Sequence, residues 1–518
     1  MKKRRASSPK KRRRRAIIAF EMIRLDRTVA EPLHQQLYRQ IRDEIVTGSF
    51  NHHSARLPST RTLAAELGIA RMTVKMAFER LSAEGYLEAR TGSGTFVAPD
   101  LPEKFLSSRR PLAAQPNEPK FEARRARVAE RVKKIPDDRA GKQFDVGIAG
   151  PPGVSFVPAL AAIDEFPIET WERLRTQVLA RKGAHLLQYA ASHGDLDLRK
   201  AIAAYLCDFR GARCHPDQIV ITAGTQQALM IAALALVNRG EIAWLEDPGF
   251  NQARRVFAFA GATVVPRPVD DEGILIGQPD RKASPKIIFV TPSHQFPLGM
   301  TMSLERRKAL IDFASARDAF IFEDDHSSEF RYNGPPLPCL QGLDPSGRVI
   351  YAGTMSKILF PSLRLGYLLA PEPLVDSLIK IRAVTDQHSS AIDQATLARF
   401  ISEGFFLSHI KRMRKLYADR REYFIEKFNE LVGDHFRLQI PEAGLHFVAW
   451  LRRKEDWPLI AEAVAAAGLR PVPLSASCIE ATPGPALNFG FAAWTRAQIR
   501  EGLTKLATEL RERSHTSR

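Results

Sequence analysis

Cysteine is scarce in this chain, and its scarcity argues against two kinds of architecture. The 518 residues include four dispersed cysteines, namely Cys207, Cys214, Cys339 and Cys478. They show none of the short spacings that zinc sites use, and a disulfide framework needs a far higher density of cysteine. We therefore predict reduced thiols and no metal site.

Long apolar runs are also missing. The nearest candidate, ALMIAALALV at 228–237, is much shorter than the roughly 20 residues that a membrane-spanning helix needs. The basic N-terminus is not followed by the apolar stretch of a secretory signal. We therefore expect a cytoplasmic protein with no membrane partner. Its length and its 44% hydrophobic content predict more than one domain and at least one large core.

Acidic residues are outnumbered, at 58 against 76 Lys and Arg, which gives a formal net charge of +18. Ten of the basic residues lie within residues 2–15 (KKRRASSPKKRRRR), so the remainder carries +18 − 10 = +8. Two interpretations of this tail, residues 1–22, stay open. It is either a disordered, solvated segment or a DNA-binding arm that neutralises phosphates and releases counterions. A nuclear-localisation signal has the same pattern, but the rest of the sequence has a bacterial character.

Residues 23–98 carry the pattern of a winged helix-turn-helix. Apolar residues recur every four positions in LHQQLYRQIRDEIVTG, which predicts an amphipathic helix. A second, short helix is expected from an N-cap at Ser59 to a stop at Gly68, and a third over RMTVKMAFERLSAEG. Two short strands around the Gly92–Gly94 turn predict a wing. In such a module the third helix lies in the major groove.

The motifs of this module resemble those of GntR-type DNA-binding domains. They are RLPSTR at 56–61, LA at 63–64, TV at 73–74, GYL at 85–87 and GSGTFV at 92–97. The resemblance implies binding to double-stranded DNA through Arg61, Arg71, Thr73, Lys75, Gly92 and Gly94. Arg71, at the helix start, is placed for a base edge, and Arg61 and Lys75 for phosphates. Any one of these cations, taken singly, could instead be a solvated surface residue.

Residues 99–143 change in composition and predict a linker. They are rich in Pro, Arg, Lys and Ala and lack sustained apolar periodicity, except around 121–133, where one short helix is expected. The basic balance of the segment allows it to lie along DNA. A solvated linker is the simpler interpretation.

Residues 144–518 alternate between apolar strands and helical segments. The expected strands are VIT before Gly224, IAWLED at 242–247, ATVVPRPV at 262–269, KIIFVTP at 286–292, FIFEDDH at 320–326 and VIYAGT at 349–354. This pattern predicts a large α/β domain with a mainly parallel sheet covered on both faces. Functional residues are then expected where the strands end.

Several candidate residues stand at those strand ends. The turn Gly224–Gln226 opens a helix, where backbone N–H groups and the helix dipole favour a phosphate. Phe250 offers a ring for stacking, although an isolated Phe is more often a core residue. Asp324 follows an apolar strand and would pair with a pyridinium N–H, unless it is a helix cap or a solvated carboxylate. Lys357 could form an imine with an aldehyde, although an isolated lysine is usually a surface residue.

In this order the motifs resemble the aspartate-aminotransferase superfamily of fold type I pyridoxal-phosphate (PLP) enzymes. Together with the N-terminal module they resemble the MocR/GabR group, which fuses a GntR-type winged helix to that fold. The strings are ITAGTQQAL (221–229), EDPGF (246–250), TPSHQFPLG (291–299), EDDHSSEFRY (323–332), YAGTMSKILFPSLRLGY (351–367) and KRMRKLY (411–417). The resemblance covers residues 31–97 and 145–510.

The resemblance implies a role for each candidate. Lys357 forms the Schiff base with PLP, and Asp324 pairs with the pyridine nitrogen. Phe250 stacks on the ring, and the phosphate is bound by Thr354, Ser356, Arg364, Gly224, Thr225 and Gln226. Tyr189 matches a tyrosine that the family sends into the neighbouring subunit's site, which implies a head-to-tail, domain-swapped homodimer with two DNA-reading modules.

Two positions depart from the family pattern. His326 stands where the family usually has a tyrosine that hydrogen-bonds the cofactor's phenolic oxygen, and a histidine can titrate near neutral pH. His294 and Gln295 are expected to share that oxygen. Asn488 lies near the place where aminotransferases have the arginine that clamps the substrate carboxylate. Both changes argue against efficient transamination, whereas Lys357, Asp324 and Arg364 favour cofactor capture.

The resulting hypothesis is a cytoplasmic bacterial regulator that associates with the nucleoid when it binds its operator. PLP, or an adduct of PLP with an amine effector, alters operator binding through linkage between two sites. We expect at most weak transaminase activity. The alternatives are a working PLP-dependent aminotransferase with an accessory DNA-binding domain, and a DNA-binding protein whose second domain only dimerises.

Overall fold

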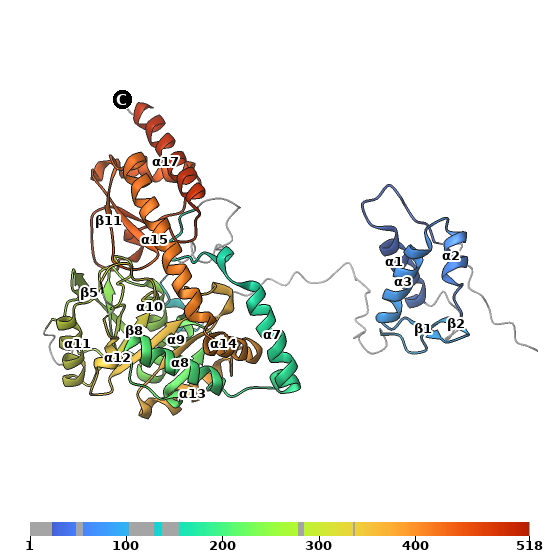
Figure 1. The fold of residues 1–518 in the computed structure, drawn as a ribbon, viewed down its shortest axis with the longest axis horizontal. Coiled ribbons are helices and arrows are strands. Elements are labelled where there is room, and N and C mark those ends of the chain that lie inside the picture. Colours follow the sequence, from blue (N-terminus) through green and yellow to red (C-terminus); the bar gives the residue numbers. More distant parts are fainter. Residues whose placement is uncertain are drawn as a thin grey trace, which may run out of the picture. The chain divides into compact units, whose positions relative to one another are not determined.

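The computed structural model describes residues 23–47, 55–102, 129–136, 155–277, 284–334 and 337–516 (Figure 1). The chain divides into two compact units, Met1–Arg124 and Arg125–Arg518. The basic tail at 1–22 and most of the expected linker lie outside the described residues. Within 129–136 the structure has one helical turn, α5 (Glu130–Lys133), in the region where a short helix is expected.

The first unit has the predicted order of three helices and a wing. Its elements are α1 (Leu33–Val46), α2 (Thr60–Glu66), α3 (Arg71–Ala83), β1 (Leu87–Arg90) and β2 (Gly94–Val97). Leu37, Val74 and Phe78 lie in the core that joins the three helices. Ser59 caps α2 as predicted, because its hydroxyl accepts a hydrogen bond from the Thr62 amide at 3.1 Å.

The wing is a two-stranded antiparallel ribbon. Arg90 pairs with Gly94 at the turn, and Leu87 pairs with Val97 at the other end. Gly94 has φ +107°, and a Cβ there would lie 2.9 Å from Nε of Arg56. Both the backbone conformation and the close approach of Arg56 therefore favour glycine at this position.

The second unit is built on an eight-stranded sheet with the order β3-β10-β9-β8-β7-β4-β5-β6. The strands are β3 (Ile219–Thr222), β4 (Ile242–Asp247), β5 (Thr263–Asp270), β6 (Gly273–Ile274), β7 (Ile287–Val290), β8 (Phe320–Asp325), β9 (Val349–Thr354) and β10 (Gly366–Leu369). The central pairs are parallel, as predicted. β10 runs antiparallel to both of its neighbours, so the sheet is mixed.

Helices cover both faces of this sheet (Figure 1). One face packs against α9 (Thr225–Leu236), α10 (Asn251–Ala260) and α13 (Glu372–Thr385). The other packs against α7 (Ile168–Lys182), α8 (Leu196–Arg210), α11 (Leu304–Ala316), α12 (Leu340–Leu343) and α14 (Ala391–Ser402). The apolar run at 228–237 belongs to α9, whose buried side chains lie in the first of these layers. No helix in the described part of the chain is long and apolar enough to cross a membrane.

A second, four-stranded sheet has the order β11-β12-β14-β13 and was not predicted from the sequence. Its strands are β11 (Phe436–Gln439), β12 (His446–Leu451), β13 (Val472–Pro473) and β14 (Ala486–Gly490). A core rich in phenylalanine joins it to α15 (Phe405–Val432), α16 (Trp457–Ala466) and α17 (Arg496–Thr516). Phe424 of the long helix α15 stacks on Phe447 with ring centroids 5.3 Å apart.

Candidate cofactor site

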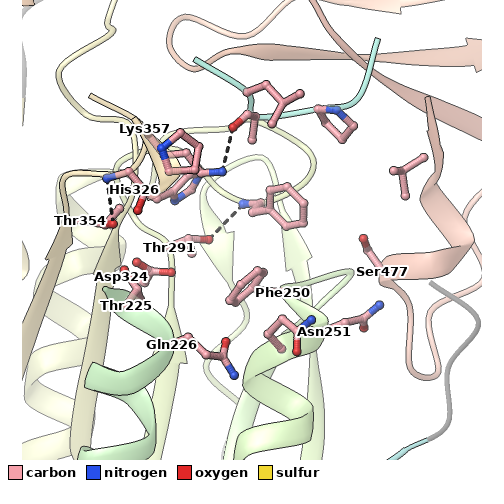
Figure 2. Close-up of a pocket in the computed structure, with 18 of the residues that line it drawn as sticks. Thr225, Gln226, Phe250, Asn251, Thr291, Asp324, His326, Thr354, Lys357 and Ser477 are labelled. Carbon is pink, nitrogen blue, oxygen red and sulfur yellow. Dashed lines mark hydrogen bonds between the residues drawn. The ribbon is translucent and has the colours of Figure 1, made fainter. Parts of the chain in front are cut away.

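A cavity of about 280 Å³ lies in the second unit, where several strands of the large sheet end (Figure 2). It is lined mainly by apolar surface, with a few convergent polar groups, as is usual for small-molecule sites. Nine of the twelve residues predicted for the cofactor line it: Thr225, Gln226, Phe250, Asp324, His326, Thr354, Ser356, Lys357 and Arg364. They come from five separate stretches of sequence, so the fold has brought them together.

Lys357 stands three residues after the end of β9 and reaches into the cavity. Its Nζ donates a 2.8 Å hydrogen bond to the backbone carbonyl of Ala159 (Figure 2). Burial lowers the pKa of Lys357 to about 8, although the charge of Asp324 acts in the opposite direction. A lysine with this pKa supplies far more neutral, nucleophilic amine at neutral pH than an exposed lysine does.

Asp324 is a buried carboxylate in the second-last position of β8. Burial and the neighbouring Asp325 raise the pKa of Asp324 to about 7. Its Oδ1 has no hydrogen-bond partner among the described residues. An unpaired buried carboxylate is costly, so this atom fits a group that donates a proton or carries positive charge.

The other end of the cavity suits an anion. Gly224 precedes the first turn of α9, so the free N–H groups of that turn and the positive end of the helix dipole lie beside Thr225 and Gln226. Arg364 adopts φ +49°, a strained conformation for a non-glycine residue. A Cβ on Gly224 would lie 3.6 Å from Nη1 of Arg364, so Gly224 itself adjoins the cavity without lining it. The Arg364 guanidinium makes no hydrogen bond or ion pair with any residue in the described ranges.

Phe250 combines the two interpretations that the sequence left open. It packs partly into the core, where its ring stacks on Phe289 with centroids 6.3 Å apart. The same ring also lines the cavity, in Figure 2 between the lysine side and the side formed by Asn251 and Ser477. The core packing therefore fixes a ring whose free surface is available for stacking.

Three histidines cluster beside the cavity, and two of them, His294 and His446, are buried. His326 lines the cavity, whereas His294 lies behind it with ring centroids 5.8 Å from His326 and 5.0 Å from His446. Burial and the neighbouring His446 lower the pKa of His326 to about 3. The expectation that His326 titrates near neutral pH is therefore wrong, since burial keeps the imidazole neutral.

Three other residues lie away from the cavity lining. Tyr189 is 89% exposed, with its ring 6.1 Å from that of His388. Asn488 is buried on β14, and its Oδ1 has no hydrogen-bond partner within the described ranges. Gln295 uses its amide to hold a loop, donating to Glu246 and to the carbonyls of Pro248 and Phe296. It is not free to share a ligand oxygen as expected.

The sequence reasoning missed several lining residues. They are the segment 157–160, Asn251, Gln252 and Arg255 on α10, Thr291, Phe296 and Pro361, and Val472, Ala476 and Ser477 at and near β13. Asn251 follows Phe250 directly, so its position beside a candidate residue was a usable signal. The segment 157–160 carried no such signal, because Ala159 contributes a backbone carbonyl.

The DNA-contact candidates lie on the first unit. Arg61 on α2 and Arg71 and Lys75 on α3 are exposed, and Thr73 is partly buried. Lys75 forms an exposed ion pair with Glu79 at 3.5 Å. Arg71, Lys75 and the exposed Met72 and Met76 leave one side of α3 open, while Val74 and Phe78 pack inward.

Comparison with known families assigns both units. The family described as bacterial regulatory proteins, gntR family, matches residues 33–97. The family described as aminotransferase class I and II matches residues 161–506. The predicted combination of domains is therefore confirmed, and PLP is the cofactor of the second domain.

Full-length relatives share the same combination. The chain is 38% identical to the probable rhizopine catabolism regulatory protein MocR of Rhizobium meliloti, over 94% of this chain and 95% of that protein. It is 35% identical to the HTH-type transcriptional regulator YdeL of Bacillus subtilis, over 93% and 97% of the two chains. Among solved structures, the kynurenine aminotransferase of Pyrococcus horikoshii has a TM-score of 0.68 at 26% identity, covering 74% of this chain and 97% of that one.

Proposed function

We propose, from the premise that this chain belongs to the MocR/GabR-type group of GntR-family transcriptional regulators, that its cavity senses PLP or a PLP–amine adduct and thereby alters operator binding. The chain is a PLP-dependent, DNA-binding regulator. The observation that carries the sensing proposal is the convergence of Lys357, Asp324 and Arg364 on one cavity in a chain that also has a winged helix.

Each cavity residue has a proposed task. When bound, PLP supplies an aldehyde that reacts with amines and a ring that withdraws electrons. Lys357 would hold that aldehyde, and Asp324 would accept a hydrogen bond from the N–H of the protonated ring nitrogen, which satisfies its unpaired Oδ1. Phe250 stacks on the ring, and His326, as a neutral imidazole, donates to the phenolic oxygen.

The phosphate has a separate set of proposed partners. Arg364 supplies a planar pair of donors, and the first turn of α9 supplies backbone N–H groups next to Gly224, Thr225 and Gln226. Thr354 and Ser356 precede Lys357 and line the same cavity, and their hydroxyls complete the set. His294 acts indirectly, by packing behind His326.

Sensing requires that the two ligands affect each other's affinity. With PLP bound, Lys357 would link the cofactor to the strand end at β9, and an effector amine that took the place of Lys357 would remove that link. If the DNA-bound and free forms of the protein hold that strand end differently, the effector changes the affinity for the operator. The operator then changes the affinity for the effector by the same factor. The effector would share this cavity of about 280 Å³ with PLP, so we propose that it is a small amine.

The active assembly is proposed to be a head-to-tail, domain-swapped homodimer. Tyr189 and two other large apolar or aromatic side chains, Leu187 and Val384, are 89%, 74% and 84% exposed. Single exposed apolar side chains are common on monomers, but aromatic side chains are enriched at protein interfaces, and Tyr189 is the most exposed of the three. Sedimentation of the full chain tests this proposal, with Tyr189→Ala expected to weaken cofactor binding in the neighbouring subunit.

The remaining parts of the chain have proposed roles as well. The domains are proposed as a DNA-binding domain at 23–98, a linker at 99–143 and a PLP domain at 144–518. The basic tail at 1–22 adds non-specific contact with DNA phosphates, which keeps the regulator on the nucleoid.

A paired titration tests the sensing proposal. PLP is added to the purified protein while absorbance reports capture, and operator affinity is measured by fluorescence anisotropy at each step. Candidate amines are then added in the same format. We expect PLP, an amine, or both to change the operator dissociation constant. Unchanged operator affinity with PLP bound and with every amine tested would contradict sensing.

A working aminotransferase is the second candidate, favoured by the cavity and by the fold that it shares with kynurenine aminotransferase. His326 and Asn488 argue against it, because an imidazole stands where the family has a tyrosine, and the Asn488 amide lacks the guanidinium that clamps the substrate carboxylate. Turnover of amino donors to keto acids, measured with and without operator DNA, separates the two candidates. Rapid turnover without any effect on operator binding would favour the enzyme.

The rate of PLP capture is expected to depend on pH through Lys357. A lysine of pKa about 8 is roughly one-tenth neutral at pH 7, against about one part in three thousand for an ordinary lysine. The initial rate should therefore rise about tenfold per pH unit below pH 8 and level off above it. Stopped-flow absorbance between pH 6 and pH 10 measures this. A rate that keeps rising to pH 10 would mean that Lys357 titrates normally.

Arg71→Ala should weaken operator binding by roughly 1–3 kcal/mol, because the side chain is proposed to read a base edge. Lys75→Ala is the matched comparison on the same helix. Because Lys75 is proposed to contact a phosphate, Lys75→Ala should weaken binding to all DNA sequences alike and lower the salt dependence of binding. Neither change should alter PLP capture. Equal losses on operator and unrelated DNA for Arg71→Ala would contradict base reading.

A further inference from the structure

Two cysteines of the second unit lie side by side. Cys207 is exposed near the C-terminal end of α8, and Cys214 is partly buried in the segment that follows. Their Sγ atoms are 3.8 Å apart. A disulfide bond is about 2.05 Å long, so the two sulfur atoms must move roughly 2 Å closer to form one.

We propose that Cys207 and Cys214 form an oxidisable dithiol, which a hydroperoxide converts into an intramolecular disulfide that changes the affinity of the cavity for PLP. This inference does not depend on effector sensing. It concerns a modification site outside the cavity, since neither cysteine lines it.

The chemistry proceeds in two balanced steps. The Cys207 thiolate attacks one peroxide oxygen, the O–O bond breaks, and Cys207 becomes a sulfenic acid, while the hydroxide or alkoxide that leaves takes a proton from solvent. The Cys214 thiol then attacks the sulfenic sulfur, the S–O bond breaks, and the proton of Cys214 leaves with the hydroxyl as water. The two thiols are oxidised by two electrons in total, and the peroxide takes up both.

The environments of the two thiols set this order. Burial, together with the neighbouring Cys207 sulfur, raises the pKa of Cys214 to about 12. Cys214 is therefore a poor first nucleophile, whereas Cys207 is open to solvent. Once Cys207 carries a neutral hydroxyl, it no longer opposes a charge on Cys214, so the second step becomes easier than a direct attack by Cys214.

The other two cysteines provide internal controls. Cys339 is buried and accepts a hydrogen bond from the Gly342 amide at 3.4 Å. Cys478 donates to the carbonyl of Leu474 at 3.4 Å, and no other sulfur is recorded near it in the described part of the chain. Neither has a second thiol to resolve a sulfenic acid.

The dithiol has a direct structural route to the cavity. Arg210 lies between the two cysteines in sequence, and its guanidinium forms a buried ion pair with Asp325 at 2.6 Å. Asp325 follows Asp324 on β8. The Arg213 backbone is bound in addition by both ends of the Gln341 side chain, at 3.0 and 2.8 Å. A disulfide that tightens this short segment therefore pulls on the strand that carries Asp324.

The experiment uses the full-length protein with PLP and stoichiometric hydrogen peroxide. Free thiols are counted, and tryptic peptides are mapped without reduction. Trypsin cleaves after Arg210 and Arg213, so the disulfide joins the peptide 201–210 to the peptide that begins at Cys214. PLP affinity is measured before oxidation, after it, and after a dithiol reductant. Cys207→Ser and Cys214→Ser are the test variants, and Cys478→Ser is the matched control.

We expect the wild type and Cys478→Ser each to lose two free thiols reversibly and to give the linked peptides. Their PLP dissociation constant should change by about threefold or more, a typical coupling for connected sites. Cys214→Ser should stop at a sulfenic acid that dimedone traps on Cys207. Absence of the linked peptides, or a disulfide between two chains, would overturn the dithiol. A disulfide with unchanged PLP affinity would overturn its connection to the cavity.

Discussion

Lys357→Ala is expected to abolish the visible absorbance that develops when PLP is added, and with it every change in operator binding that PLP produces. The alanine has no amine to react with the aldehyde, so only the phosphate and ring contacts remain. Operator binding without PLP should be unaffected, since the winged helix lies in the other unit. Absorbance and fluorescence anisotropy on the same samples measure both effects.

Two further variants make this test specific. Lys357→Arg keeps the positive charge but has no amine that forms an imine, so it should fail in the same way as alanine. Lys380→Ala removes an exposed lysine from α13 and should behave like the wild type, which excludes non-specific labelling of surface amines. If Lys357→Ala still responded to PLP, the covalent bond would not be the signal.

The strands of the large sheet could be predicted from the sequence because most are continuous apolar runs. IAWLED and VIYAGT were predicted with the bounds that β4 and β9 have in the structure. The direction of β10 could not be predicted in the same way. Its residues, Gly366–Leu369, form a short apolar run, but an apolar run does not state which neighbours it pairs with or in which direction.

The four-stranded sheet was missed for a related reason. Its strands β11, β12 and β14 are separated by loops and by α16, so their pairing is set by contacts distant in sequence. The phenylalanines that bind this sheet to α15 recur in elements that look independent when the sequence is read along the chain. The core exists only after those elements pack.

The candidate site likewise contains residues that could be predicted from the sequence and residues that could not. Lys357, Asp324 and Arg364 could be found because each stands in a recognisable string at a strand end. The carbonyl of Ala159 that binds Lys357 could not, because every residue has a backbone carbonyl. The pKa of His326 was misjudged since it depends on burial beside His446, a residue 120 positions away that packs against the cavity only in the folded chain.

Arg210→Met should lower the free energy of unfolding by about 3–5 kcal/mol, the usual cost of removing one partner from a buried ion pair. Burial alone would raise the pKa of Asp325. The Arg210 guanidinium, with hydrogen bonds from Tyr351 and Ser328 at 2.6 and 2.8 Å, holds that pKa below its usual range instead. Without Arg210 the carboxylate is buried unpaired, so its pKa should rise above the value of about 3.9 in the unfolded chain.

The pH dependence and a double variant distinguish this mechanism from a simple loss of packing. The difference in free energy of unfolding between the wild type and Arg210→Met should shrink as the pH falls toward 4, because a protonated Asp325 needs no cation. Arg210→Met combined with Asp325→Asn should recover much of the stability at neutral pH, since it leaves no buried charge. Lys505→Met removes an exposed ion pair with Glu501, so it should leave the free energy of unfolding nearly unchanged. Urea titrations at pH 5 and pH 7 measure all three variants. If the double variant were no more stable than Arg210→Met, the loss of stability would come from lost packing. The unpaired charge of Asp325 would then not be its cause.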